Sequence, residues 1–391
     1  MSSKTLMTRP RPLPTASTRR WRAAALAGAL ALVLGACGGS GDTDAGSPTS
    51  AAPADVDAAK AAIKPYVDQP TPFPIETPLA VKPTGKRIAF MDCGSAICGV
   101  FAALAKPAAE QLGMEFTPIK SGLSADSVNA AFNTVVQAKY DGVFVPAIQP
   151  SLWKRGLEQL DAAGIHVTTA GVVGVDTSKV AMSQVSDTMI ERTAKLAASY
   201  VVAEQGDKAD VVFYVTPEIA FNPVLEKTFS AELTRLCPAC SVRSEKVPAA
   251  ALGTQAPTII SDDLQAHPKT TAAVFGQSEA TAGLPQALKT AGIDPSLLKL
   301  GIFPDPATLQ LIKDGQIDVG LGFDAPVVAW TEIDSLARLS TGEPVAPGAK
   351  ADTPPQQFLT KEILADKDVS RGWVAYPDFP KRFAALWSQA S

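Results

Sequence analysis

The sequence predicts an α/β protein with two doubly wound parallel sheets, and three observations support this fold class. Short apolar runs alternate with segments of helical periodicity, which is typical of βαβ units. This alternation occurs twice along the body of the chain, with a break between the two halves. The chain has 391 residues, of which 46% are hydrophobic and 19% charged, so it is long enough for two domains and too apolar to be disordered throughout.

The N-terminus has the layout of a secretory signal over residues 1–36. A basic stretch, Arg19–Arg22, precedes an apolar run that ends in small residues. This run of about 14 residues is shorter than the roughly 20 that span a bilayer as a helix. The sequence Leu34-Gly35-Ala36-Cys37 resembles the bacterial lipobox, which implies a lipid on Cys37 that anchors the protein to the outer face of the cytoplasmic membrane. The alternative is a secreted protein in which Cys37 is unmodified.

Residues 37–84 are expected to form a tether between the lipid and the folded body. Gly38–Asp55 consists almost entirely of Gly, Ser, Ala, Asp, Thr and Pro, a composition that stays flexible. A short helix is predicted over Val56–Lys64, where Pro65 stops it. The prolines of residues 68–84 favour an extended path to the first strand.

The charge distribution argues against nucleic-acid binding. Residues 1–36 carry six of the 35 basic side chains and no acidic one, which leaves a body with 29 basic and 39 acidic residues. An acidic body lacks the basic face that nucleic acids require. The two histidines, His166 and His267, are too few for a histidine-rich metal centre, and we expect neither a metal nor a cofactor.

The cysteines other than Cys37 form two close pairs. Because export leads to an oxidising compartment, we predict local disulfides between Cys93 and Cys98 and between Cys237 and Cys240. A zinc site with four cysteine ligands is an alternative that requires both pairs to converge. A thioredoxin-like redox role is another alternative, but it requires a helix N-terminus, and the second pair follows the end of a helical segment.

The first half of the body alternates strand and helix. Ser124 is a plausible N-cap for the second of its helices, and Gly113 ends the first. The strands are predicted at Arg87–Met91, Met114–Ile119, Gly142–Pro146 and Gly164–Thr169, and the helices at Val100–Leu112, Ser124–Ala138 and Ser151–Ala163.

The second half repeats this alternation. Because doubly wound sheets bind ligands beyond the carboxyl ends of their strands, two such sheets facing each other would enclose a cleft. The strands are predicted at Asp210–Val215, Val242–Val247, Ala272–Gly276, Leu298–Phe303 and Ile317–Leu321, and the helices at Asp187–Gln205, Asn222–Leu236, Pro257–Ala266, Glu279–Ala291, Pro306–Asp314 and Val327–Ser340.

Short motifs spread over about residues 86–345 resemble a known family. They are Lys139–Val145, Ala162–Val167, Ala272–Glu279 and Asp314–Ile317. In order and spacing they are similar to the type I solute-binding proteins of bacterial ABC importers, of the ribose- and galactose-binding kind. The resemblance implies two α/β lobes joined by a three-segment hinge. The crossings would fall near Val185-Ser186, Phe323-Asp324 and Lys361-Glu362.

The resemblance also implies domain limits and partners. The N-terminal lobe would comprise residues 86–185 and about 324–361, and the C-terminal lobe residues 186–323 and about 362–391. A monomer would capture a small solute in the interlobe cleft and deliver it to the permease subunits of an ABC transporter. The alternative is a lipoprotein that presents its ligand to a membrane sensor. A secreted hydrolase is more remote, because no nucleophile and base stand at catalytic spacing.

The ligand-facing residues are expected at the carboxyl ends of the strands, where the family places its pocket. The phenylalanines among them could instead belong to the core, and the acidic residues could instead be helix N-caps. The candidates are Asp92, Ser95, Phe101, Gln149, Ala170 and Gly171 in the N-terminal lobe and Phe221, Asn222, Gln277, Ser278, Glu279, Phe303, Asp305, Phe323 and Asp324 in the C-terminal lobe.

Two departures from the sugar-binding relatives bear on the ligand. Those relatives carry an Asp-Arg pair after the fourth strand, where this chain has Ala170-Gly171. They also carry a Gln at the hinge, where this chain has Phe323. We therefore expect a solute with a partly apolar or aromatic binding face, since aromatic rings accept apolar, aromatic and cationic groups. A free monosaccharide is the alternative.

Overall fold

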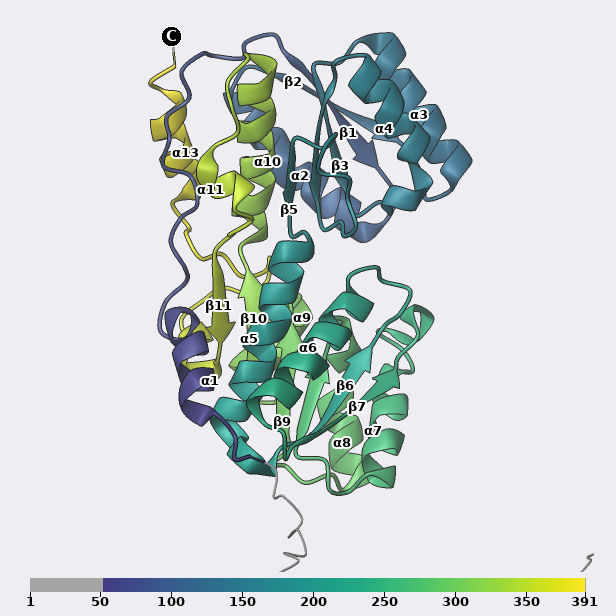
Figure 1. Ribbon diagram of the computed structural model, residues 1–391, viewed down its shortest axis with the longest axis vertical. Helices are drawn as coiled ribbons and strands as arrows, with labels where there is room; N and C mark the ends of the chain where they lie inside the picture. The colour runs from purple at the N-terminus through teal and green to yellow at the C-terminus, as the bar shows by residue number, and fades with distance from the viewer. Residues whose placement is uncertain (1–51, 391) are drawn as a thin grey trace, which may run out of the picture. The chain divides into compact units, whose positions relative to one another are not determined.

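The computed structural model describes residues 52–390, which contain two sheets, each covered by helices on both faces (Figure 1). The predicted signal sequence and Cys37 lie outside the described residues. The first sheet has the order β2-β1-β3-β4-β5, and all its strands are parallel. Its strands are β1 (Arg87–Asp92), β2 (Glu115–Lys120), β3 (Gly142–Pro146), β4 (His166–Ala170) and β5 (Met182–Gln184).

Four long helices cover the first sheet, and together with it they form what we call the first lobe. Helix α3 shows why its sequence folds this way: Ser124 and Ser127 form a reciprocal capping box at its start, and Val128 and Phe132 are buried on one face. The helices are α2 (Ala96–Gln111), α3 (Ala125–Ala138), α4 (Lys154–Ala162) and α10 (Ala325–Ser340).

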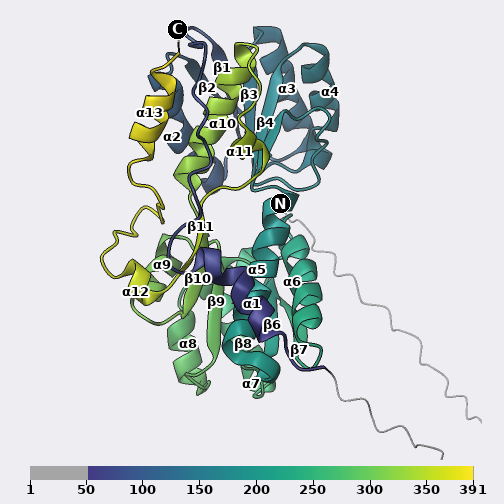
Figure 2. The same ribbon diagram turned by 60° about the vertical axis from the view of Figure 1, so that its left-hand side comes forward.

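The second sheet and its helices form the second lobe (Figure 2). The strand order is β11-β10-β9-β8-β6-β7, and only β11 is antiparallel to its neighbour. The strands are β6 (Asp210–Val215), β7 (Ser241–Lys246), β8 (Ala272–Phe275), β9 (Leu298–Ile302), β10 (Val319–Phe323) and β11 (Gln356–Leu359). The helices are α5 (Asp187–Gln205), α6 (Asn222–Leu236), α7 (Ala256–Ala266), α8 (Leu284–Ala291), α9 (Pro306–Lys313) and α12 (Lys361–Leu364).

These two doubly wound sheets confirm the predicted fold class. Helices α5 and α6 and strand β6 begin and end where the sequence predicts them. The sequence does not predict the edge strands β5 and β11. Both are short and rich in glutamine or serine, so they lack the alternating apolar pattern that predicts a strand. They are buried because segments from distant parts of the chain pack on them.

The sequence predicts three passages of the chain between the lobes. The structure has two of them at the predicted residues and the third at a different position. The passages from β5 to α5 and from β10 to α10 occur at Val185-Ser186 and Phe323-Asp324, as expected. The third lies at residues 351–355, between α11 (Pro347–Lys350) and β11. The expected position, Lys361-Glu362, instead begins α12, which packs on α9 within the second lobe. Residues 356–361 therefore belong to the second lobe and not to the first.

The segment before β1 is packed, which differs from the expected tether over residues 37–84. Helix α1 (Val56–Ile63) lies against α5 and α6 of the second lobe. A short 3-10 helix (Lys64–Tyr66) follows, and residues 67–84, which we call the N-terminal arm, then run to the first lobe without further helix or strand, with Ile75 and Leu79 buried. The close approach of the arm requires Gly348 of α11, since a Cβ there would lie 1.7 Å from the Pro74 carbonyl oxygen. Apolar anchors between the prolines therefore fix this segment.

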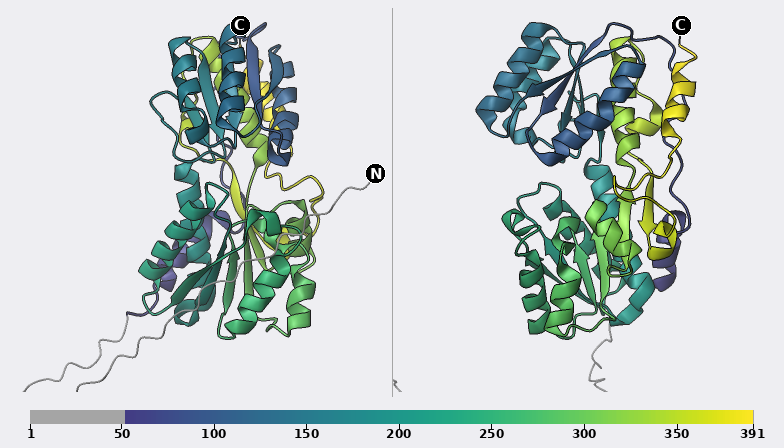
Figure 3. Two further views of the ribbon diagram at one scale, coloured as in Figure 1. Left: turned by 90° about the vertical axis from the view of Figure 1, so that its right-hand side faces the viewer. Right: turned by 180° about the vertical axis from the view of Figure 1, so that it is seen from behind.

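The C-terminal helix also differs from expectation. Helix α13 (Phe379–Trp387) packs on α10 of the first lobe, although residues 362–391 are expected in the second. The rings of Trp387 and Trp330 stack with centroids 5.4 Å apart, and Trp387 Nε1 donates to Asp334 Oδ1 over 2.8 Å. The views of Figure 3 show α13 alongside α10. A buried tryptophan pair thus holds α13 on the first lobe, and the spacing of residues in the sequence does not predict this contact.

The N-terminal arm and α13 contact each other and form a clasp, which we define as residues 71–81 and 376–387. The ring of Phe73 lies edge-on to Tyr376 and Phe383, at 5.5 and 5.3 Å between centroids. The Leu79 N–H donates to the Leu386 carbonyl over 3.1 Å. These contacts join the N-terminal arm to the C-terminal helix.

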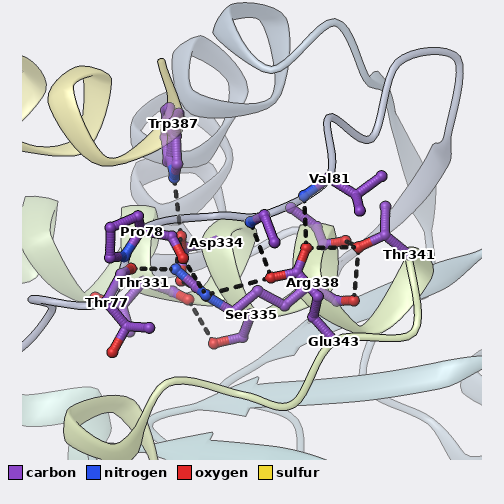
Figure 4. Close-up of polar contacts among 12 residues, drawn as sticks. Thr77, Pro78, Val81, Thr331, Asp334, Ser335, Arg338, Thr341, Glu343 and Trp387 are labelled. Atoms are coloured by element: carbon purple, nitrogen blue, oxygen red, sulfur yellow. Dashed lines mark hydrogen bonds and ion pairs between the residues drawn. The ribbon is translucent and has the colours of Figure 1, made fainter. Parts of the chain in front are cut away.

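One buried ion pair fastens the clasp to α10 (Figure 4). Arg338 Nε lies 2.7 Å from Asp334 Oδ2, and both side chains are almost fully buried. The other guanidinium nitrogens donate to the carbonyl oxygens of Thr77 and Pro78 in the arm, over 2.6 and 3.1 Å. Arg338 therefore uses its fork of donors to bind one helix and the arm at once.

Candidate ligand-binding site

The loop that follows β1 is closed by a disulfide. Cys93 at the end of the strand is bonded to Cys98 in the first turns of α2, and the second predicted disulfide, Cys237–Cys240, is also present. Both pairs are therefore bonded locally, as predicted, and no four-cysteine zinc site forms among them. Within the first loop Gly94 N–H donates to Asp92 Oδ1 over 3.0 Å. These bonds hold Asp92 at the carboxyl edge of the first sheet.

The other first-lobe candidates divide between the edge of the sheet and the core. Gln149 and Gly171 follow β3 and β4 and are half-buried, as Asp92 and Ser95 are. Phe101 is 3% exposed, and its ring lies 5.9 Å from that of Phe144, so it belongs to the core. Ala170 is fully buried at the end of β4. Phe101 and Ala170 therefore do not lie at the surface that a ligand could reach.

A chain of hydrogen bonds links the second-lobe candidates that follow β6 and β8. Asn222 Oδ1 accepts from the Thr216 N–H over 3.1 Å, and Asn222 Nδ2 donates to the Gly276 carbonyl over 3.1 Å. Asn222 Nδ2 also reaches Gln277 Oε1 at 3.4 Å, and Gln277 Nε2 in turn donates to Glu279 Oε2. Buried Asn222 thus orients Gln277, and Gln277 orients Glu279.

Ser278 joins the loops that follow β8 and β9. Its hydroxyl donates to the Phe303 carbonyl and accepts from the Asp305 N–H, each over 3.1 Å. Asp305 in turn caps α9 by accepting from the Thr308 N–H over 2.8 Å. Ser278 is fully buried and therefore acts by positioning the two loops. Asp305 is half-buried and is a helix N-cap, which is the alternative role that the sequence indicates for the acidic candidates.

Three phenylalanines lie together at this edge of the second sheet. The rings of Phe303 and Phe323 are 5.0 Å apart with an interplanar angle of 80°, and those of Phe221 and Phe303 are 5.9 Å apart at 68°. All three are half-buried. Phe303 has a φ of 53°, a left-handed conformation that is costly for a bulky residue. Strain of this kind concentrates at functional positions, so the trio is the distinctive feature of the site.

Asp324 is structural. It is fully buried, caps α10 through the Val327 N–H, and accepts from the backbone N–H groups of Ala375 and Tyr376 over 2.8 and 3.2 Å. Burial raises its pKa to about 6, although these hydrogen bonds oppose the rise. Its oxygens are occupied by backbone donors, so Asp324 does not face a ligand.

Glu279 differs from Asp324 because it is half-buried at the edge rather than fully buried. Burial raises the pKa of its carboxyl, and the negative charge of Asp305 raises it further. Its own backbone N–H and the amide of Gln277 partly offset the shift. A carboxylate in this setting is stabilised by any cation that comes close to it.

Sequence reasoning misses the residues that fix the hinge. Asp352 accepts from the Val185 N–H with one oxygen and from the Ser186 and Met189 N–H groups with the other, at 2.8 to 3.1 Å. Arg192 donates to the Asp352 carbonyl over 2.6 Å. Asp352 lies 160 or more positions from these partners, so no local signal in the sequence could reveal the contacts.

No helix among residues 52–390 is both long and apolar enough to cross a membrane. The same residues contain no group of three or more His, Cys, Asp or Glu side chains arranged to hold a metal ion.

Comparison with known proteins gives one family. Residues 94–344 match the periplasmic binding protein domain. No curated protein sequence matches the chain.

Many solved structures share the fold. The 5-methylthioribose transporter solute-binding protein from Thermotoga lettingae, solved with 5-methylthioribose, has a TM-score of 0.60 and 18% identity over 80% of this chain and 95% of its own. A solute-binding protein from Burkholderia graminis, solved with D-arabinose, has a TM-score of 0.61 and 15% identity over 72% of this chain and 98% of its own. A periplasmic ribose ABC transporter protein from Conexibacter woesei has a TM-score of 0.57 and 16% identity over 73% and 95%.

Proposed function

This chain belongs to the periplasmic binding protein family, and from that premise we propose that it captures a small organic solute outside the cytoplasm for an ABC importer. The observation that carries the proposal is the family match over residues 94–344, in a chain whose parallel strands present reachable polar and aromatic side chains at their carboxyl ends. The solute would lie between the two lobes, which would close over it about the passages at Val185-Ser186, Phe323-Asp324 and residues 351–355.

The solute would be sugar-like or partly apolar. Structures of the same fold have been solved with 5-methylthioribose and D-arabinose, which supports a sugar-sized ligand. Ala170 and Gly171 offer no side-chain hydrogen bond where sugar binders offer a charged pair, and Phe303 and Phe323 offer rings. Ten candidates remain as proposed contacts: Asp92, Ser95, Gln149, Gly171, Phe221, Gln277, Glu279, Phe303, Asp305 and Phe323.

The test of this function is a ligand screen on the purified protein. A solute that binds only the folded state raises the unfolding temperature as its concentration rises, so sugars, polyols, aromatic acids and amines can be compared by thermal shift. Calorimetric titration of each hit then gives the affinity. Micromolar binding of at least one solute supports the proposal, and a complete screen without a stabilising compound contradicts it.

The proposal includes a lipid anchor at Cys37. Its support is the lipobox-like sequence that ends the apolar run. Replacing Cys37 with Ala should release the protein from the membrane fraction or block its processing. A variant that stays shortened and membrane-bound would show that another segment anchors the chain.

A further inference from the structure

We propose that the second lobe recognises a positively charged nitrogen on the solute, with Glu279 as the counter-ion and the rings of Phe221, Phe303 and Phe323 as the walls around it. The inference rests on the proposed function, because it assumes that the carboxyl ends of the strands bind the solute. It goes further by assigning a chemical class, a small organic ammonium compound, to the group that the second lobe holds.

The first argument is charge. The loops that follow β6, β8, β9 and β10 contain four carboxylates and no lysine or arginine. Three of the four are engaged by backbone N–H groups of other residues: Glu218 by Ala249, Asp305 by Thr308, and Asp324 by residues 327, 375 and 376. Glu279 has only the amide of Gln277 and its own N–H. Among these four carboxylates, Glu279 is therefore the one that is half-buried and has no N–H donor from the backbone of another residue.

The second argument is the position of Glu279 between the ring-bearing loops. On one side Gln277, which bonds Glu279, is bonded by Asn222, the neighbour of Phe221. On the other side Ser278, which precedes Glu279, donates to the carbonyl of Phe303. The hydrogen bonds thus tie the loop that carries Glu279 to the loops that carry Phe221 and Phe303.

The third argument is the chemistry of the rings. A phenylalanine ring attracts a cation to its face through its quadrupole, and the attraction is largest where water is excluded. Phe303 stands edge-on to both neighbours, so the three rings present faces in different directions.

The experiment compares cationic probes with neutral partners of similar shape. Choline is titrated beside 3,3-dimethylbutan-1-ol, and glucosamine beside glucose, by calorimetry on the full-length protein. In at least one pair the cation should bind about tenfold or more tightly than its neutral partner, and this preference should shrink in about 0.5 M salt, which screens charges.

Two variants and a matched control locate the effect. Glu279→Gln keeps the shape of the side chain and should abolish the preference for the cation over its neutral partner. Phe323→Leu keeps an apolar side chain and should weaken cation binding about 2- to 30-fold, the range of a cation–π contact. Glu204→Gln, an exposed position on α5, makes the same change in net charge and should change neither affinity.

The outcomes separate this inference from the proposed function. Equal binding within both pairs, or a preference that survives Glu279→Gln, overturns the inference. Binding of a neutral sugar without binding of either cation also overturns it and leaves the proposed function standing. If none of the four probes binds, the inference fails, and the broader thermal-shift screen alone decides the proposed function.

Discussion

Arg338 shows how a charged residue becomes part of the core. Its side chain is about 2% exposed and Asp334 is fully buried, so both charges have lost their hydration. Arg338 recovers that loss through four polar partners: Asp334, Glu343 and the carbonyls of Thr77 and Pro78. Such a cluster is stable only while it is complete, because one missing partner leaves a buried charge uncompensated.

Removing Arg338 should therefore be severe. Arg338→Ala leaves Asp334 buried without its cation, and the free energy of unfolding should fall by about 3–5 kcal/mol in urea titration. The matched control is Arg235→Ala on α6, which breaks an exposed ion pair with Glu232 and should cost less than about 1 kcal/mol. Similar losses in the two variants would show that burial is not the cause.

Glu332 is a second buried acidic residue, and no cation among residues 52–390 lies beside it as Arg338 lies beside Asp334. It lies fully buried on α10, and within the described residues neither carboxylate oxygen has a hydrogen-bond partner of normal geometry. Burial raises its pKa well above the ordinary value of 4.5; the nearby Thr168 hydroxyl opposes this, and the charge of Asp352 adds to it. The native carboxyl therefore keeps its proton at pH values where the unfolded chain has released it.

This difference makes stability depend on pH. The native state binds the extra proton above pH 4.5, so the contribution of Glu332 to the free energy of unfolding falls as the pH rises toward the native pKa. Glu332→Gln removes this dependence, so the stability of the variant relative to the natural protein should increase as the pH rises above 4.5 toward the native pKa, by up to about 1.4 kcal/mol per pH unit. Urea titrations at several pH values measure it. A gain that does not grow with pH, or that Glu204→Gln reproduces, would contradict this.

At the scale of single elements, helix α5 depends on a residue from another part of the chain. Its N-terminal N–H groups lack partners within the helix, as in any helix. Asp352, in the third passage between the lobes, accepts from the Val185, Ser186 and Met189 N–H groups and also from the Ser186 hydroxyl. One carboxylate therefore couples the first passage to the third.

Replacing this carboxylate with an amide isolates the coupling. Asp352→Asn retains a side chain that tolerates the φ of 48° at this position, but the amide nitrogen cannot accept the hydrogen bonds. Hydrogen exchange at residues 185, 186 and 189 should accelerate, and stability should fall by about 1–3 kcal/mol. Thr353→Ala, at the exposed neighbouring position, should leave exchange at α5 unchanged. Unaltered exchange in Asp352→Asn would show that the contact is dispensable.

The sequence predicts those helices and strands whose limits depend only on the hydrophobic pattern of their own residues. Helix α6 and strand β6 carry their own periodicity, so their limits follow from their own residues. The carboxyl ends of the parallel strands, and with them most of the candidate site, follow from the same pattern. The pattern does not determine which of the candidate side chains are accessible to a ligand. Phe101 and Asp324, for example, are buried by neighbours from distant parts of the chain.

At the scale of the whole molecule, the described chain passes between the two lobes five times rather than three. The N-terminal arm adds one passage and residues 365–378, between α12 and α13, add another. The rings of Phe73 and Tyr376 bring these two passages together. A composition rich in proline predicts an extended segment but does not reveal that partners some 300 positions away will bind it.

The clasp should act as one cooperative unit. Trp387→Ala removes the stacking on Trp330 and the hydrogen bond to Asp334, and stability should fall by about 3–5 kcal/mol. Because Leu79 bonds the neighbouring Leu386, hydrogen exchange at Leu79 should also accelerate in this variant. Gln389→Ala, exposed just beyond α13, serves as the control and should change neither quantity. Loss of stability with full protection at Leu79 would show that the arm and α13 act independently.

The clasp also affects the order in which parts of the chain can fold. The arm leaves the ribosome before either sheet, but its partners Arg338, Tyr376 and Leu386 come near the end of translation. Contacts between such distant residues form slowly, because a long loop must close first. Leu79 therefore cannot form its bond to Leu386 until the last helix exists. In a chain that lacks α13, the N-terminal arm stays unpacked and is accessible to proteases and chaperones.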